Sequence, residues 1–65
     1  MDPIDTTNKY LVGTRADEVV ILGTAKLLRG PMWATDALNL AAWLVVMADP
    51  EGTEFPKYLE AVQNS

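Results

Sequence analysis

The sequence of 65 residues contains neither cysteine nor histidine. Without cysteine no disulfide can form, and without both residues a zinc site would have only carboxylates, carbonyl groups and water as ligands. The same absences remove the commonest general base and the thiol nucleophile of enzymes, and Ser65 is the only serine. No phosphate-binding glycine motif is present either. We therefore expect a non-enzymatic protein with no metal and no cofactor.

Positive charge is also scarce, because five lysines and arginines face nine acidic residues and leave a net charge of −4. Binding to a nucleic-acid backbone depends on lysine and arginine, so we do not expect a nucleic-acid partner. A small acidic protein suits the basic surface of another protein.

The longest apolar run, residues 37–48, is interrupted only by Asn39. As a helix it would span about 18 Å, well short of the roughly 30 Å hydrocarbon layer of a membrane. The first residues carry no basic region of the kind that opens a signal peptide. We expect a soluble protein of the cytoplasm with no membrane partner.

This run predicts a buried helix over residues 36–48, which Thr35 would cap and which would end before Pro50. A helix that is apolar on every side needs cover on every side, and a chain this short supplies little. We expect its alanine-rich side to approach a sheet. The opposite side would then form the interface of a homodimer or higher oligomer. Three residues lie on that opposite side: Asn39, Trp43 and Val46. The alternative is that the chain's own C-terminal helix covers Trp43.

The rest of the chain predicts an α+β domain over residues 10–65, after a flexible N-terminus at 1–9. Apolar and β-branched residues indicate antiparallel strands at 10–13 and 18–23, joined by a turn. Residues 23–32 would continue the second strand past a bulge at Gly23, add a third strand at about 25–29, or make one helical turn at 25–29, and we favour extended structure. The last element is an amphipathic helix at 54–62, which Thr53 would cap. We expect its apolar stripe to pack on the domain as a lid. The stripe consists of Phe55, Tyr58, Leu59 and Val62.

One cluster suggests a ligand site, because two of the five basic residues and an aromatic side chain stand just before a helix start. The tentative site comprises Lys26, Arg29, Gly30, Trp33 and Thr35. Basic side chains, helix amides and an indole face suit an anionic or nucleotide-like molecule. The simpler interpretation is that Trp33 belongs to the core and the two bases pair with surface acids.

We therefore expect a small, acidic, homo-oligomeric binding module with an accessory or inhibitory role toward another macromolecule, most plainly a protein. Two copies would join their sheets edge to edge or pack their main helices together. Binding or sequestering a small ligand is one alternative. A purely structural subunit of a larger assembly is another.

Overall fold

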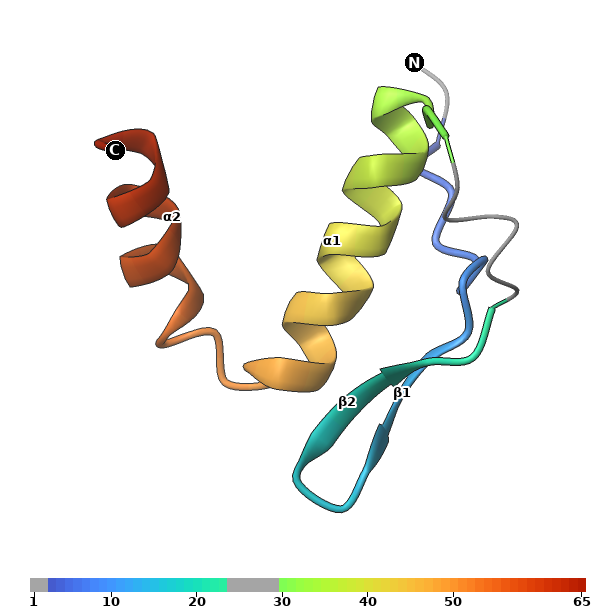
Figure 1. Cartoon of the computed structure of the whole chain (residues 1–65), viewed down its shortest axis with the longest axis horizontal. Helices are drawn as coiled ribbons and strands as arrows, with labels where there is room; N and C mark the ends of the chain where they lie inside the picture. The colour runs from blue at the N-terminus through green and yellow to red at the C-terminus, as the bar shows by residue number, and fades with distance from the viewer. Residues whose placement is uncertain (1–2, 24–29) are drawn as a thin grey trace.

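The computed structural model describes residues 3–23 and 30–65 and confirms a small α+β fold (Figure 1). A two-stranded antiparallel sheet is followed by two helices. The elements are β1 (Val12–Arg15), β2 (Glu18–Ile21), α1 (Ala34–Ala48) and α2 (Phe55–Gln63). The third strand or helical turn considered for residues 25–29 lies outside the described residues. No helix in the described part of the chain is long and apolar enough to cross a membrane.

β2 begins at Glu18 as predicted, but β1 begins two residues later than expected. Leu11 takes a left-handed backbone conformation with φ of 51°, which interrupts the extended chain before Val12. The side chain of Asn8 also bonds to the backbone of Val12. Asn8 Oδ1 accepts a hydrogen bond from the Val12 amide, and Asn8 Nδ2 donates one to the Val12 carbonyl, both at 2.9 Å. The register pairs Val12 with Ile21 and Arg15 with Glu18. The connecting turn needs a left-handed residue, and Ala16 takes that conformation with φ of 54°.

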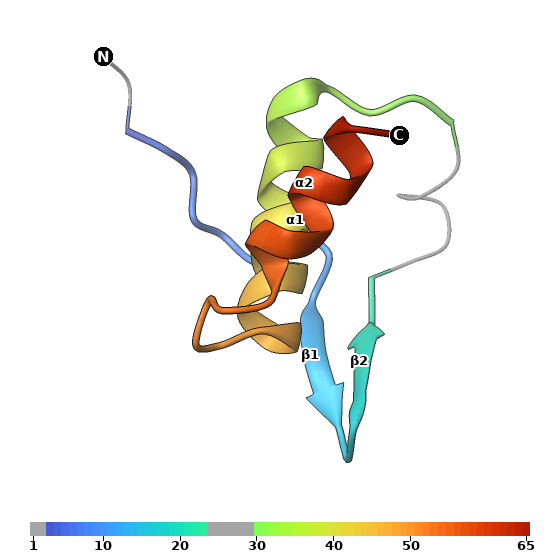
Figure 2. The same ribbon diagram turned by 90° about the vertical axis from the view of Figure 1, so that its left-hand side faces the viewer.

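The core is very small. Among the described residues only Tyr10 and Val12 are buried, with 6% and 3% of their surface exposed. Both lie where β1 begins, and α1 contacts both strands. The hairpin projects beyond the C-terminal end of α1 in both views (Figures 1 and 2). The fold therefore covers α1 along one side only.

The structure corrects two predictions about α1. First, the helix is not buried, since every one of its residues is exposed or only partly covered. Second, the alanine-rich side faces outward: Ala37, Ala41 and Ala48 are exposed, while Trp43 and Met47 are partly covered. The physical reason is area, because turning the larger side chains inward removes more apolar surface from water than turning alanines inward.

The prediction of a C-terminal lid is also wrong. Every residue of α2 is exposed, and the helix stands apart from the rest of the chain beyond the turn that follows α1 (Figure 1). Thr53 does not cap it, since the residue before its first turn is Glu54 and no capping bond comes from that side chain. The helix is amphipathic as predicted, but all residues of its apolar stripe are exposed.

A close backbone contact makes Gly23 a sensitive position. Its amide donates to the Tyr10 carbonyl at 2.9 Å, and a Cβ at this position would lie 2.9 Å from the same oxygen. Gly23→Ala should therefore lower the free energy of unfolding by about 1–3 kcal/mol in a urea titration. Gly13→Ala is the matched control, because a Cβ there meets nothing within 4 Å. Equal stability of the two variants would contradict the expectation.

Candidate interaction surface

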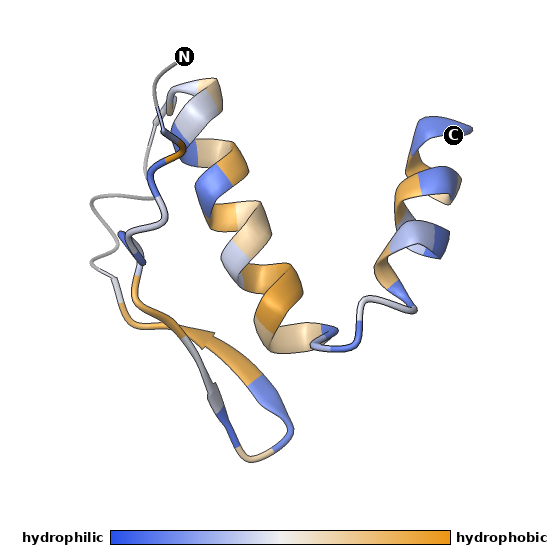
Figure 3. Ribbon diagram, turned by 180° about the vertical axis from the view of Figure 1, so that it is seen from behind, coloured by the Kyte–Doolittle hydropathy of each residue, from blue (hydrophilic) through white to orange (hydrophobic). Residues whose placement is uncertain are grey.

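The outward side of α1 is an uninterrupted apolar surface, which we call the open face. It consists of Ala37, Leu38, Ala41, Ala42 and Val46, all exposed. Leu38, near its N-terminal end, exposes 70% of its surface, and Val46, at its C-terminal end, exposes 56%. Figure 3 shows how much of the α1 ribbon is apolar, above all in its C-terminal half. No charged side chain interrupts this face.

One edge of the open face belongs to a groove between α1 and residues 3–9. The groove has a volume of about 860 Å³. All three predicted interface residues line it: Asn39, Trp43 and Val46. Thr35 lines it as well, together with Leu38 and Ala42 of the open face and Ile4 of the N-terminal segment. The structure therefore brings the predicted interface together on one concave surface.

Polar contacts hold the N-terminal segment against α1. Asn39 Nδ2 donates to the carbonyl oxygens of Asp5 and Thr7 at 3.0 and 2.9 Å. Lys9 Nζ lies 2.8 Å from Asp36 Oδ1 and 3.4 Å from Asp5 Oδ2. The hydrogen bond to Asp36 raises the pKa of Lys9, and hydrogen bonds from Thr7 lower the pKa of Asp5. Residues 3–9, predicted to be a flexible end, thus form one wall of the groove.

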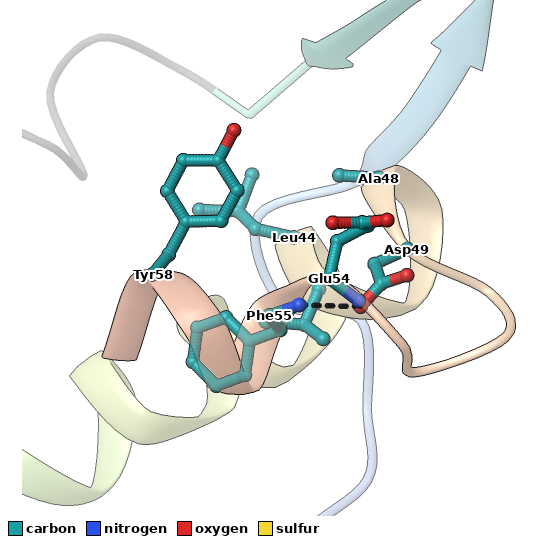
Figure 4. A pocket seen from close by; sticks show the side chains of 7 residues that line it. Leu44, Ala48, Asp49, Glu54, Phe55 and Tyr58 are labelled. Atoms are coloured by element: carbon teal, nitrogen blue, oxygen red, sulfur yellow. Dashed lines mark hydrogen bonds between the residues drawn. The ribbon is translucent and has the colours of Figure 1, made fainter. Parts of the chain in front are cut away.

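The second feature is the turn at residues 49–54 between α1 and α2, which we call the elbow. Asp49 makes hydrogen bonds to both helices there. Its backbone amide makes the last helical hydrogen bond of α1, to the Val45 carbonyl at 2.7 Å. Its Oδ2 accepts the amides of Phe55 at 2.7 Å and Glu54 at 2.9 Å, as Figure 4 shows for this carboxylate. These bonds satisfy free amides at the start of α2. The Asp49 side chain therefore fixes where α2 begins, directly after its backbone has made the last bond of α1.

A smaller groove of about 490 Å³ lies at this elbow, between the end of α1 and the start of α2. Leu44 and Ala48 contribute from α1, and Phe55 and Tyr58 from α2 (Figure 4). Leu59 and Val62 continue the exposed apolar stripe along α2. The open face of α1 and the stripe of α2 are thus two apolar surfaces on one chain.

Removal of the Asp49 carboxylate should destabilise the helical conformation of α2. In Asp49→Ala we expect the helical signal in circular dichroism to fall by up to about three-eighths, because α2 supplies 9 helical residues and α1 supplies 15. Glu51→Ala is the control, since that exposed acid lies in the same turn and caps neither helix. An unchanged signal in Asp49→Ala would contradict the role of the carboxylate.

The same bond gives the elbow a pH dependence with a defined sign. The Phe55 amide, followed by other amides of the turn, lowers the pKa of Asp49 from its ordinary 3.8. A lowered folded-state pKa stabilises the folded form above about pH 4 and loses that effect as pH falls through the folded-state value. The helical signal of α2 should therefore decrease in acid, and Asp49→Asn should remove this part of the pH dependence.

The structure does not assemble the tentative ligand site. Lys26 and Arg29 lie outside the described residues. Gly30 has φ of 83°, and Trp33 is 80% exposed, so the interpretation of Trp33 as a core residue is wrong. Thr35 is the second residue of α1 and not its cap, because the helix begins at Ala34. The described residues include no group of three acidic side chains placed to hold a metal ion.

Sequence reasoning missed two residues that shape these surfaces. Asn8 and Asp49 act through their own side chains on backbone groups four to six positions away. The available signal was the residue type, since asparagine and aspartate commonly bond nearby backbone in turns.

Comparison of the chain with protein-family models, curated proteins and solved structures finds no match.

Proposed function

We propose that this chain is a non-enzymatic binding module that works as a homodimer and acts as an accessory or inhibitory protein on another protein. The observation that supports the proposal is the exposed apolar surface. Only two described residues are buried, whereas thirteen large hydrophobic residues are exposed. Isolated exposed apolar residues are ordinary on protein surfaces, but a contiguous face is typical of an interaction site.

The solvent-accessible area indicates how much surface a partner would need to bury. The chain exposes 5705 Å², about 1,600 Å² more than the roughly 4,100 Å² of a compact monomer of 7.1 kDa. Its radius of gyration is 13.0 Å, against about 10.7 Å for a compact domain of 65 residues. If two copies each covered that excess, the interface would bury about 3,200 Å² in total, which is typical of obligate homodimers.

Charge supports a basic protein as the further partner. Among the described basic residues, Lys9 pairs with Asp5 and Asp36, and Lys57 pairs with Glu54. Carboxylates therefore outnumber available cations on the described surface. A dimer would double this negative charge and attract a basic protein surface at a rate that falls with added salt.

The self-association is tested by measuring molecular mass over a wide range of concentration. Sedimentation equilibrium of the full chain should give twice 7.1 kDa at high concentration and a decreasing average mass on dilution. The thermal midpoint should rise with concentration, because only the associated state covers the apolar faces. A mass of 7.1 kDa at every concentration, with a constant midpoint, would overturn the proposal.

A further inference from the structure

α2 needs a partner that the described part of its own chain does not supply. The helix has 9 residues, and isolated helices shorter than about 12–15 residues are marginal in water. Phe55 and Tyr58 border the small groove against the end of α1, yet these and all other residues of α2 remain exposed. The Asp49 carboxylate caps its start but covers none of its stripe. Packing of the stripe against another surface is what would stabilise the helix.

We propose that α2 is an exchanged arm: in the homodimer, the α2 stripe of one copy packs on the open face of α1 of the second copy, and reciprocally. This proposal rests on the self-association proposed above and adds which surfaces meet. It makes the dimer interface a contact between helices, with the hairpin outside it.

The two surfaces match in length and shape. Nine residues of α2 span about 12 Å between their first and last Cα atoms, and the open face from Ala37 to Val46 spans about 13.5 Å. Three of its five side chains are alanines, which leave hollows for large neighbours. The aromatic rings of Phe55 and Tyr58 are side chains of the size that fills such hollows.

A second copy fits these surfaces better than the chain's own α2 or a charged partner. At the elbow, Asp49 bonds to Val45 on one side and to Phe55 on the other. In this arrangement α2 runs back along the side of α1 opposite the hairpin but diverges from it, and every residue of α2 stays exposed (Figure 1). Two-fold symmetry brings two stripes to two faces and leaves none uncovered. If a charged partner surface packed here, its charges would be buried without partners, because the open face has no charged side chain.

Disulfide trapping in the full chain tests the exchange, because the chain has no cysteine of its own. The test variant carries Ala41→Cys and Leu59→Cys, at the centres of α1 and α2, where contact does not depend on the relative direction of the helices. After mild oxidation we expect a covalent dimer as the main product. Peptide mapping by mass spectrometry should show a bond from position 41 of one copy to position 59 of the other.

The matched control pairs Ala41→Cys with Glu60→Cys, which lies on the polar side of α2. It should give about tenfold less 41–60 bond between copies, because disulfides need Cα atoms within about 7 Å and side chains that point toward each other. A monomer closed by an internal 41–59 bond would overturn the exchange, since α2 would then lie on its own α1.

The failure of the exchange and the failure of the homodimer give different results. If the reduced variant sediments as a dimer but forms no 41–59 bond between copies, the exchange is overturned and the homodimer stands. If the parent chain and the reduced variant are both monomers at every concentration, both proposals fail together.

Discussion

Tyr10→Ala is expected to remove from about a third to all of the free energy of unfolding. Tyr10 and Val12 are the only buried residues in the described chain, so the aromatic ring is most of the core. Removal of a buried aromatic side chain costs about 3–5 kcal/mol. A domain of this length has a total stability of about 3–10 kcal/mol. The far-UV circular dichroism of the variant should lose its cooperative urea transition or show it at much lower urea.

Trp33→Ala is the control for this prediction. It also removes a large aromatic side chain, but Trp33 exposes 80% of its surface. We expect the free energy of unfolding to change by less than about 0.5 kcal/mol. If both variants lost equal stability, the core would not be where the structure places it, and the original interpretation of Trp33 as a core residue would return.

The elements of this fold could be predicted from the sequence because each has a strong local signal. The main helix was expected at 36–48 and is found at Ala34–Ala48, where Pro50 sets the end. β-branched residues marked the second strand, and an apolar stripe at helical spacing marked α2. These signals depend only on neighbours in the sequence.

The arrangement of the elements could not be predicted in the same way. α1 has apolar residues on every side, so its pattern does not say which side meets the sheet. The answer depends on the larger side chains of Trp43 and Met47, which are partly covered, while the alanines remain outside. The position of α2 depends on the Asp49 carboxylate, which bonds across the elbow. The periodicity of apolar residues does not reveal such a contact.

The candidate surface was predicted in part for the same reason. Asn39, Trp43 and Val46 do share one concave surface, but the wall opposite them is the N-terminal segment at residues 3–9. Nothing in the composition of that segment indicated a fixed position. Its place depends on long-range bonds, from Asn39 to two carbonyl groups and from Lys9 to Asp36.

Leu38→Glu should convert the dimer to a monomer, and it has the largest effect that we expect on self-association. Leu38 is the largest side chain of the open face and is 70% exposed, so a carboxylate there costs the single chain little. In a helix-to-helix interface the same carboxylate would be buried without a partner. That costs about 3 kcal/mol or more and weakens the dimer by at least a hundredfold. Sedimentation equilibrium measures the change directly.

Leu22→Glu separates the two ways in which copies of this chain can meet. Leu22 is also 70% exposed, but it follows β2, so its glutamate would disturb an edge-to-edge sheet and leave the open face intact. With helices at the interface, Leu22→Glu stays dimeric and Leu38→Glu does not. The reverse result would place the interface at the hairpin. Because the residue type, the exposure and the added charge are the same in both variants, only the location of the interface can make them differ.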